Sequence, residues 1–334
     1  MKPNALVRAL VAGVAAAGAF AAVPAAQAQL VKLDGSSTVY PISEAVAEEF
    51  QKSTRGKVKV TVGISGTGGG FKKFCRGEID VANASRPILK REMEVCRVAG
   101  IEYFELPVAF DALTVVVNTK NGFVKQLTVA ELKKMWEPAA QGKVTTWRQV
   151  NPQWPDAAFK LFGPGADSGT FDYFTEAVVG KSKSARGDFT ASEDDNVLVQ
   201  GVARDANGLG YFGYAYYIEN KDKLRAVPIV NEKGQPVAPS MESVLEGTYS
   251  PLARPIFIYV RAAALARPEV KEFVGYYMQH GPQLAAEVKY VPLPERAYKA
   301  SWEHVLKGRK GTVFGGAAEA GVTIDELLAR EAAL

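Results

Sequence analysis

The sequence predicts an α/β fold of two lobes, in which each lobe is a mostly parallel β-sheet flanked by helices and two hinge strands join the lobes. Three observations predict this fold. Apolar segments of strand length alternate with amphipathic segments of helix length in the first third of the chain. Two strongly apolar segments, 110–118 and 255–260, lie far apart and are typical of strands that cross between lobes. The length of 334 residues suits two domains of ordinary size.

The N-terminus carries the pattern of a secretory signal peptide. Lys2 and Arg8 precede a continuous apolar run, and an Ala-Gln-Ala run ends at Ala28. The alternative is a membrane anchor, but the apolar run is shorter than the roughly 20 residues that a spanning helix needs. We therefore predict that residues 1–28 are cleaved off after Ala28 and that the mature chain is exported.

The first part of the mature chain follows a β-α-β-α-β order. Residues 57–64 alternate valine with other side chains, which predicts a half-buried strand. The helix predicted at 41–52 has its apolar side chains on one face and Pro41 in its first turn. The predicted strands are 30–33, 57–64 and 79–82, and the predicted helices are 41–52 and 68–76.

The rest of the chain continues this alternation. Thr128 and Glu131 have the spacing of a capping box, which predicts the start of a helix at 128–136. The further predicted elements are the strands 110–118, 159–162 and 255–260 and the helices 170–179, 268–279 and 323–334.

The two crossing segments divide the chain into lobes. We predict one discontinuous lobe at 29–110 plus 253–334 and a second lobe at 111–252.

The charge pattern argues against nucleic-acid binding. The formal net charge is +4, and no run of Lys and Arg forms a basic stripe. The only histidines are His280 and His304, and the cysteines have no metal-ligand neighbours. We therefore expect no metal site and no cofactor.

The two cysteines, Cys75 and Cys96, have two interpretations. In an oxidising compartment they can pair as a disulfide. The alternative is a pair of buried free thiols, because cysteine packs well in protein cores.

Three loops share one design, in which small hydroxyl residues and glycines directly precede a helix. They are 34–41, 65–70 and 163–170. Helix N-termini expose backbone N–H groups that bind anions, and glycine lets the backbone approach a ligand closely. Taken singly, each loop is equally well an ordinary cap or turn. Taken together, they predict a site for a small, multiply charged oxyanion at the carboxyl ends of strands.

Arg86 follows a predicted strand at the same expected edge. An arginine side chain can hold an oxyanion through two parallel hydrogen bonds. The alternative is a surface ion pair.

Five segments of the chain resemble the phosphate-binding proteins of phosphate-specific ABC transporters. They are DGSSTVYP at 34–41, SGTGGGFKKFCRGEIDVANASRP at 65–87, GPGADSGTFDYFTE at 163–176, NGLGYFGYAYY at 207–217 and SPLARPIFIYV at 250–260. The resemblance implies a type II periplasmic-binding-protein fold that closes on phosphate like a hinged trap and catalyses no reaction. It also implies a periplasmic protein, which as a diffusing carrier suits a monomer, with a membrane permease and an ATPase as partners.

By position, the resemblance assigns ligand roles to residues of all three loops. The Ser-Gly-Thr run at 168–170 matches the family motif directly. The predicted phosphate ligands are Ser37, Thr38, Val39, Ser65, Thr67, Gly68, Arg86, Asp167, Ser168, Gly169 and Thr170.

Two positions depart from the best-known members of the family. Those members have Asp where this chain has Arg86, and Arg where it has Pro164. We hypothesise that the positive charge has moved between lobes, and that Asp167, Asp194 or Asp195 accepts the proton that phosphate keeps and sulfate lacks. For Asp167 the alternative is a helix N-terminal charge, and for the other two it is a helix cap.

Three other functions compete with phosphate capture. A secreted phosphatase needs a metal cluster or a nucleophile with an oriented base, and neither histidine is near a candidate serine in the sequence. A binding protein for sulfate, molybdate or tungstate would keep the fold and change the ligand. A sensory or adhesive protein at the cell surface would use phosphate as a regulator.

Overall fold

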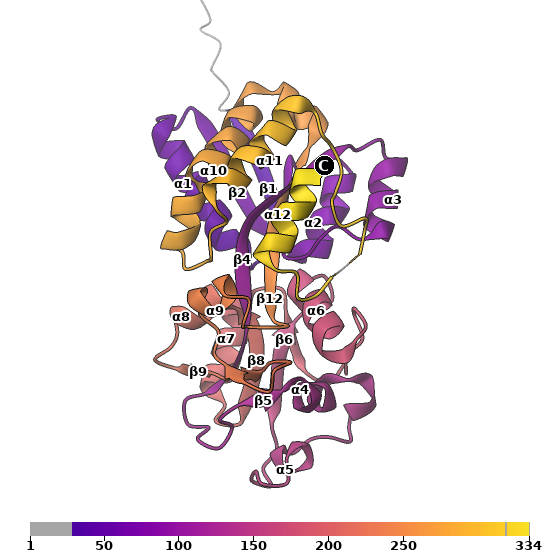
Figure 1. The fold of residues 1–334 in the computed structure, drawn as a ribbon, viewed down its shortest axis with the longest axis vertical. Coiled ribbons are helices and arrows are strands. Elements are labelled where there is room, and N and C mark those ends of the chain that lie inside the picture. Colours follow the sequence, from indigo (N-terminus) through magenta and orange to yellow (C-terminus); the bar gives the residue numbers. More distant parts are fainter. Residues whose placement is uncertain (1–28, 318, 334) are drawn as a thin grey trace, which may run out of the picture.

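The computed structural model describes residues 29–317 and 319–333, which form two lobes joined by two strands (Figure 1). The predicted signal peptide at 1–28 lies outside the described residues. The predicted α/β fold class is confirmed, because each lobe contains part of a β-sheet with helices on its faces. None of the helices formed by the described residues has the length and hydropathy that a bilayer crossing requires.

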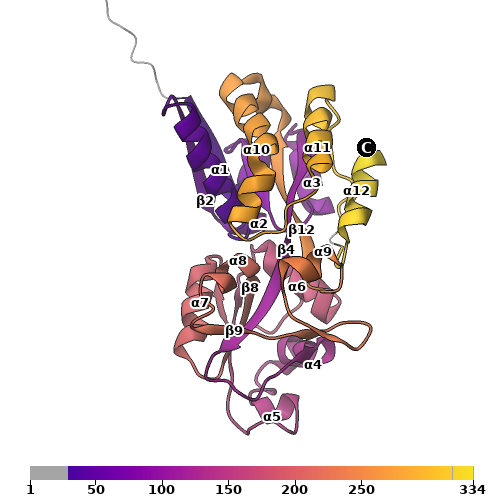
Figure 2. The same cartoon turned by 60° about the vertical axis from the view of Figure 1, so that its left-hand side comes forward.

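The two connecting strands run side by side between the lobes. Figure 2 shows β4 (Tyr103–Asn118) passing from the upper lobe of Figure 1 into the lower lobe. It pairs antiparallel with β12 (Ala253–Arg261), and every residue of β4 is buried. Burial on both faces explains why the sequence of β4 is continuously apolar over most of its length instead of alternating. Where along these strands the lobes divide stays a prediction.

The upper lobe carries the parallel sheet that the first part of the chain predicts. Its strands are β1 (Gln29–Gly35), β2 (Val58–Ile64) and β3 (Val81–Ala84), in the order β2-β1-β3-β12. β1 is parallel to both of its neighbours, and β12 is antiparallel to β3. The helices are α1 (Tyr40–Ser53), α2 (Gly66–Cys75), α3 (Lys90–Val98), α10 (Pro268–Glu287), α11 (Glu295–Lys307) and α12 (Ile324–Ala333), with a 3-10 turn at Ala262–Ala266.

The lower lobe extends the sheet from β4. The strands β8 (Gly208–Gly213), β6 (Lys160–Pro164) and β7 (Thr190–Ser192) follow β4 in that order, and β9 (Leu224–Ala226) also pairs with β4. A small second sheet contains β5 (Leu127–Thr128), β10 (Ile229–Val230) and β11 (Pro236–Val237). The helices are α4 (Val129–Trp136), α5 (Trp147–Val150), α6 (Gly169–Phe174), α7 (Asp195–Arg204), α8 (Tyr214–Ile218) and α9 (Met241–Leu245), with a 3-10 turn at Pro138–Ala140 and a π-helical turn at Thr175–Val179.

The capping box that predicts α4 is present. The backbone N–H of Glu131 donates to Oγ1 of Thr128 over 3.1 Å, and the N–H of Thr128 donates to a carboxylate oxygen of Glu131 over 2.9 Å. The strand predicted at 79–82 is wrong by two residues, because β3 begins only at Val81. The carboxylate of Asp80, just before it, accepts a hydrogen bond from the N–H of Lys32 over 3.0 Å.

The helix predicted at 170–179 is wrong in its second half. The regular helix α6 ends at Phe174, and a π-helical turn follows it. Oγ1 of Thr175 donates to the carbonyl oxygens of Phe171 and Asp172, over 2.8 Å and 3.0 Å. A side chain that bonds the preceding turn in this way competes with the regular backbone pattern.

Cys75 and Cys96 are joined by a disulfide. Both side chains are buried in the upper lobe. The bond ties the end of α2 to α3.

Candidate anion site between the lobes

The three predicted loops meet where the lobes face each other. Oγ1 of Thr38, before α1, lies 2.9 Å from Oγ1 of Thr170 in α6 of the lower lobe. Gly68, in the first turn of α2, donates its backbone N–H to the carbonyl oxygen of Asp167 over 2.7 Å. The first N–H groups of a helix have no acceptor within that helix. The starts of α1 and α2 therefore supply hydrogen-bond donors at this interlobe surface.

Two buried tyrosines, one from each lobe, hold the loop before α1. Tyr216 of α8 donates its hydroxyl to the carbonyl oxygen of Ser37 over 2.9 Å, and Tyr290 donates to the carbonyl oxygen of Thr38. Burial raises the pKa of both Tyr216 and Tyr290, so both hydroxyls stay protonated donors at neutral pH. Val39, which follows Thr38 in the sequence and is the N-cap of α1, is fully buried.

Glycine is required at position 169 because α6 presses directly on the upper lobe. A Cβ there would lie 2.4 Å from Oγ1 of Thr67 and 2.6 Å from Oγ of Ser85. Those two hydroxyl oxygens are 3.2 Å apart and belong to the second predicted loop and to the loop after β3. Ser85 therefore joins the surface, although the sequence analysis did not count it as a ligand.

Two of the predicted serine ligands already have local partners. Ser168 caps α6, because the N–H of Thr170 donates to its Oγ over 3.1 Å. Ser65 donates its hydroxyl to the carboxylate of Asp34 over 2.6 Å. Ser168 lies at the start of α6, whereas the hydroxyl of Ser65 is held within the upper lobe.

A buried ion pair lies against the two threonines. Arg254 of β12 and Asp111 of β4 face each other across the hinge strands, and Nη2 of Arg254 donates to Oδ2 of Asp111 over 2.9 Å. The same nitrogen lies 2.8 Å from Oγ1 of Thr170 and 3.4 Å from Oγ1 of Thr38. Both charged side chains are 0% exposed. This guanidinium is a buried positive centre that contacts hydroxyls from both lobes.

Arg254 and Asp111 are not among the ligands predicted from the sequence. Asp111 is the one charged residue in the apolar segment 110–118, and Arg254 directly precedes the segment 255–260. Arg and Asp are almost never fully buried unless they are paired. A charge at each of two crossing strands is therefore the signal that could have identified this pair.

Asp195, the first residue of α7, is a further buried carboxylate at this surface. Its Oδ1 accepts a hydrogen bond from Oγ of Ser37 over 3.3 Å, and Oδ2 has no hydrogen-bond partner among the described residues. Burial raises the pKa of Asp195 to about 7, and the nearby charge of Arg254 opposes that rise. Near neutral pH, Oδ2 can therefore either accept or donate a hydrogen bond.

The other two candidate proton acceptors have different surroundings. Asp194 is the N-cap of α7, as one interpretation of the sequence had it, because its Oδ1 accepts from the N–H of Asn196 over 2.9 Å. The side chain of Asp167 is 41% exposed, and its two oxygens accept from Nζ of Lys72 over 2.8 Å and 2.9 Å. Among the three aspartates, Asp195 alone combines full burial with an oxygen that has no partner among the described residues.

Arg86 is fully buried and donates to carboxylates from both lobes. Its Nε lies 2.6 Å from Oδ2 of Asp172 in α6, and its two Nη atoms each lie 2.8 Å from the carboxylate of Glu92. Nη1 also donates to the carbonyl oxygen of Pro87 over 3.0 Å. Hydrogen bonds to described residues thus engage four of the five N–H groups of an arginine. A surface ion pair is therefore excluded, and direct contact with the ligand stays a prediction.

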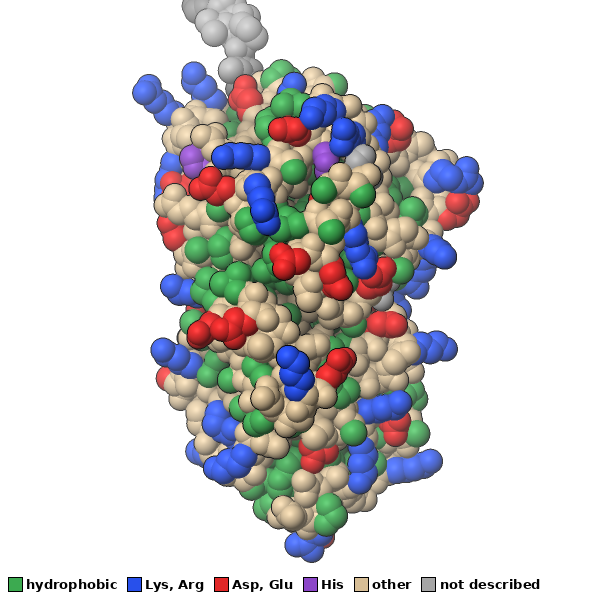
Figure 3. Space-filling view, in the orientation of Figure 1, with side chains coloured by type: hydrophobic (Ala, Val, Ile, Leu, Met, Phe, Trp, Pro, Cys, Tyr) green, Lys and Arg blue, Asp and Glu red, His purple; other side chains and the backbone are tan. Residues whose placement is uncertain are grey.

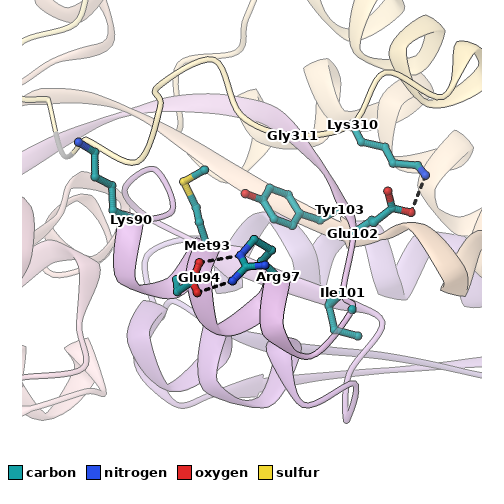
Figure 4. A pocket seen from close by; sticks show the side chains of 10 residues that line it. Lys90, Met93, Glu94, Arg97, Ile101, Glu102, Tyr103, Lys310 and Gly311 are labelled. Carbon is teal, nitrogen blue, oxygen red and sulfur yellow. Dashed lines mark hydrogen bonds and ion pairs between the residues drawn. The ribbon is translucent and has the colours of Figure 1, made fainter.

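The outer surface shows a different character from the interlobe surface. Basic and acidic side chains are interspersed over both lobes on the face in Figure 3. A hollow of about 670 Å³ lies in the upper lobe, where it is lined by residues of α3, the start of β4 and Lys310 (Figure 4). Of the charged side chains that line it, Arg97 pairs with Glu94 and Lys310 pairs with Glu102. No charge in these two pairs is left for a ligand.

Comparison with known proteins assigns the family. A model described as the PBP superfamily domain matches residues 21–280. The chain belongs to the PBP superfamily. The SphX protein of Synechococcus elongatus is 56% identical over 306 residues, which cover 92% of this chain and 90% of that protein. The phosphate-binding protein PstS of Staphylococcus saprophyticus is 40% identical over 271 residues, which cover 80% of this chain and 82% of that protein.

A solved structure shares the fold of this chain. A protein from Clostridium perfringens, assigned as the substrate-binding protein of a phosphate ABC transporter and crystallised with phosphate, has a TM-score of 0.67 and 25% identity. The match covers 80% of this chain and 100% of that one. The resemblance seen in the five sequence segments is thereby confirmed, and the two lobes with two hinge strands form a type II periplasmic-binding-protein fold.

Proposed function

We propose that this protein captures inorganic phosphate in the periplasm and delivers it to an ABC importer. The observation that carries the proposal is the buried guanidinium of Arg254, which contacts a hydroxyl from each lobe. The name of the S. saprophyticus relative and the phosphate in the C. perfringens structure support the same ligand.

In the proposed complex, phosphate oxygens replace hydroxyl oxygens as acceptors for Arg254. Thr38 and Thr170 then donate their hydroxyls to the anion, because a hydroxyl hydrogen rotates to suit its acceptor. Backbone N–H groups at the starts of α1 and α2 add uncharged donors. The anion thus contacts both lobes at once, which favours their closed arrangement.

Asp195 supplies the basis for choosing phosphate over sulfate. Its ionised carboxylate can accept a hydrogen bond from a protonated phosphate oxygen, using the oxygen that has no partner among the described residues. A fully ionised sulfate offers no proton and leaves two negative charges facing each other. Asp195 therefore takes the acceptor role that the sequence analysis left open among three aspartates.

The proposal is binding without hydrolysis. The side chains described above at the interlobe surface carry hydroxyl, guanidinium, ammonium and carboxylate groups. His304 of α11 has its Nδ1 3.5 Å from the carboxylate of Glu331, and His280 lies in α10 of the upper lobe. Incubation with a chromogenic phosphate ester tests this part, and product release above the blank would contradict it.

Export and an importer complete the proposal. Removal of residues 1–28 after Ala28 would release the mature chain into the periplasm, where a permease and an ATPase receive the ligand in the inner membrane. N-terminal sequencing of the secreted protein checks the cleavage site, and a start at any residue other than Gln29 would correct it.

Calorimetric titration of the ligand-stripped mature protein with phosphate tests the main proposal. We expect micromolar or tighter binding. Arg254→Met together with Asp111→Asn removes both charges of the pair, so no buried charge is left alone. Two lost charged hydrogen bonds at roughly 1.5–3 kcal/mol each predict affinity weaker by about 10²- to 10⁴-fold.

A matched control replaces an exposed cation instead. Lys72→Met removes a side chain that is 62% exposed and pairs with Asp167 across the lobes. We expect this variant to bind within about threefold of wild type, because exposed ion pairs contribute little. Equal phosphate affinity in the control and in the doubly substituted protein would remove Arg254 from the site, and no phosphate binding by wild type would overturn the function.

A further inference from the structure

A second buried charge cluster joins the lobes next to the anion site. Arg86 of the upper lobe meets Asp172 of α6 over 2.6 Å, and both side chains are 0% exposed. Asp172 lies two residues beyond Thr170, the hydroxyl that meets Arg254. In Figure 1, α2 and α3 of the upper lobe stand over α6 of the lower lobe on this side. The Arg86–Asp172 bond is thus formed only when the lobes are in contact.

Each of the two charges also has an opposite charge within its own lobe. Glu92 accepts from both Nη atoms of Arg86 over 2.8 Å, and both residues belong to the upper lobe. Nζ of Lys183 lies 3.0 Å from Oδ1 of Asp172, and both belong to the lower lobe. Breaking a buried ion pair is usually costly because it leaves an uncompensated charge. When these lobes separate, Arg86 keeps Glu92 and Asp172 keeps Lys183 as a partner of opposite charge. The bond between the lobes can therefore form and break reversibly.

We propose that Arg86 and Asp172 form a latch that favours the closed arrangement of the lobes and slows the release of phosphate. Arg86 is then a positioning residue, which acts on the ligand through the lobes. Phosphate enters while the latch is broken and leaves only after it breaks. The latch therefore lowers the release rate strongly, and it lowers the association rate only by the fraction of ligand-free protein that is latched. The identity of the ligand as phosphate rests on the proposed function, whereas the bond between Arg86 and Asp172 concerns only the two lobes.

Asp172→Asn is the first test variant. The amide keeps the size of the side chain and removes the charge that attracts Arg86. Single-molecule FRET between dyes at the exposed positions Lys59 and Lys143 measures the closed fraction without ligand. Stopped-flow measurements give the rates with phosphate. We expect a smaller closed fraction and about tenfold faster release, with an association rate within about twofold of wild type. A circular dichroism spectrum like that of wild type checks the fold.

The matched control is again Lys72→Met. It breaks an interlobe ion pair whose two side chains are 62% and 41% exposed. We expect it to change release by less than about twofold, because exposed pairs are weak and screened by salt.

A second variant identifies the bond itself. Arg86→Lys keeps a positive charge for Glu92 but loses the planar fork that reaches two carboxylates at once. If Arg86 and Asp172 act through one bond, the protein that carries both Arg86→Lys and Asp172→Asn releases phosphate at a rate within about twofold of either single variant. Independent roles would instead multiply the two effects.

Two outcomes overturn the latch. The first is a closed fraction that stays at the wild-type value in both single variants. The second is weaker phosphate binding in Arg86→Lys without any change in the closed fraction, which is the result expected when Arg86 contacts the anion directly. If wild type fails to bind phosphate, the proposed function falls, and the FRET measurement without ligand still decides the latch.

Discussion

The carboxyl group of Asp195 links the choice between phosphate and sulfate to pH. Its pKa is raised to about 7 by burial. The ionised form accepts a hydrogen bond from protonated phosphate and repels sulfate, whereas the neutral form donates a hydrogen bond to either anion. We therefore expect sulfate to compete with phosphate below pH 7 and to compete poorly above it. The carboxyl of Asp195 faces Ser37, Arg254 and Asp111.

The size of the effect follows from the fraction of neutral Asp195. With a pKa of about 7, about 97% of the carboxyl groups are neutral at about pH 5.5 and about 3% at about pH 8.5. If sulfate binds only the neutral form, its Kd rises about 30-fold over that range. Phosphate brings a proton to the ionised carboxylate, so we expect its Kd to change less than about fivefold.

Competition calorimetry with phosphate and sulfate at the two pH values measures this effect. Asp195→Asn replaces the titrating group by an amide, so the pH dependence of sulfate binding should vanish. The variant should also bind phosphate more weakly by about 1.5–3 kcal/mol, or roughly 10- to 150-fold, since one charged hydrogen bond is lost. Equal sulfate affinity at both pH values in wild type, or an unchanged pH dependence in the variant, would refute the reasoning.

Other substitutions test the threonines, the disulfide and a buried carboxyl group. Thr170→Val removes a hydroxyl that meets Arg254 and should weaken phosphate binding by about 1–2 kcal/mol in calorimetry; unchanged affinity would exclude that hydroxyl. Cys75→Ser with Cys96→Ser removes the disulfide between residues that are 21 positions apart. This change should lower the free energy of unfolding by about 3 kcal/mol in guanidinium titrations, and an unchanged value would contradict the expectation. Burial raises the pKa of Glu331 to about 8, so the folded state holds a proton that the unfolded state loses near pH 4.5. Wild type should therefore lose up to a few kcal/mol of stability relative to Glu331→Gln between pH 5 and 9; parallel stability curves would disprove it.

The sequence patterns could predict the elements and the three anion loops because both are local properties. Alternating valines define β2, and a capping box defines the start of α4. The helix α3 was missed because it presents almost no apolar face: Cys96 is the one buried residue among its nine. A helix whose residues are mostly charged and exposed gives no hydrophobic periodicity to detect.

The ion pair between Arg254 and Asp111 could not be predicted from local patterns. The two residues are 143 positions apart and become neighbours only through the register in which β12 pairs with β4. The sequence pattern predicts a positive charge at the right surface, but it points to Arg86, whose partners Glu92 and Asp172 belong to different lobes. A helix start can be recognised from adjacent residues, whereas the charge balance of an interlobe surface depends on pairs that only the fold brings together.

The latch formed by Arg86 and Asp172 acts on affinity, whereas the titratable carboxyl group of Asp195 acts on selectivity. A change in the closed fraction acts on the lobes and therefore multiplies the Kd of every anion by the same factor. A change at Asp195 acts on one ligand oxygen and therefore alters the ratio of the two affinities. Asp172→Asn should accordingly weaken phosphate and sulfate equally, whereas Asp195→Asn should reduce their ratio. A changed ratio in Asp172→Asn would mean that the Arg86 cluster senses the charge of the anion itself, and the division between closure and recognition would then fail.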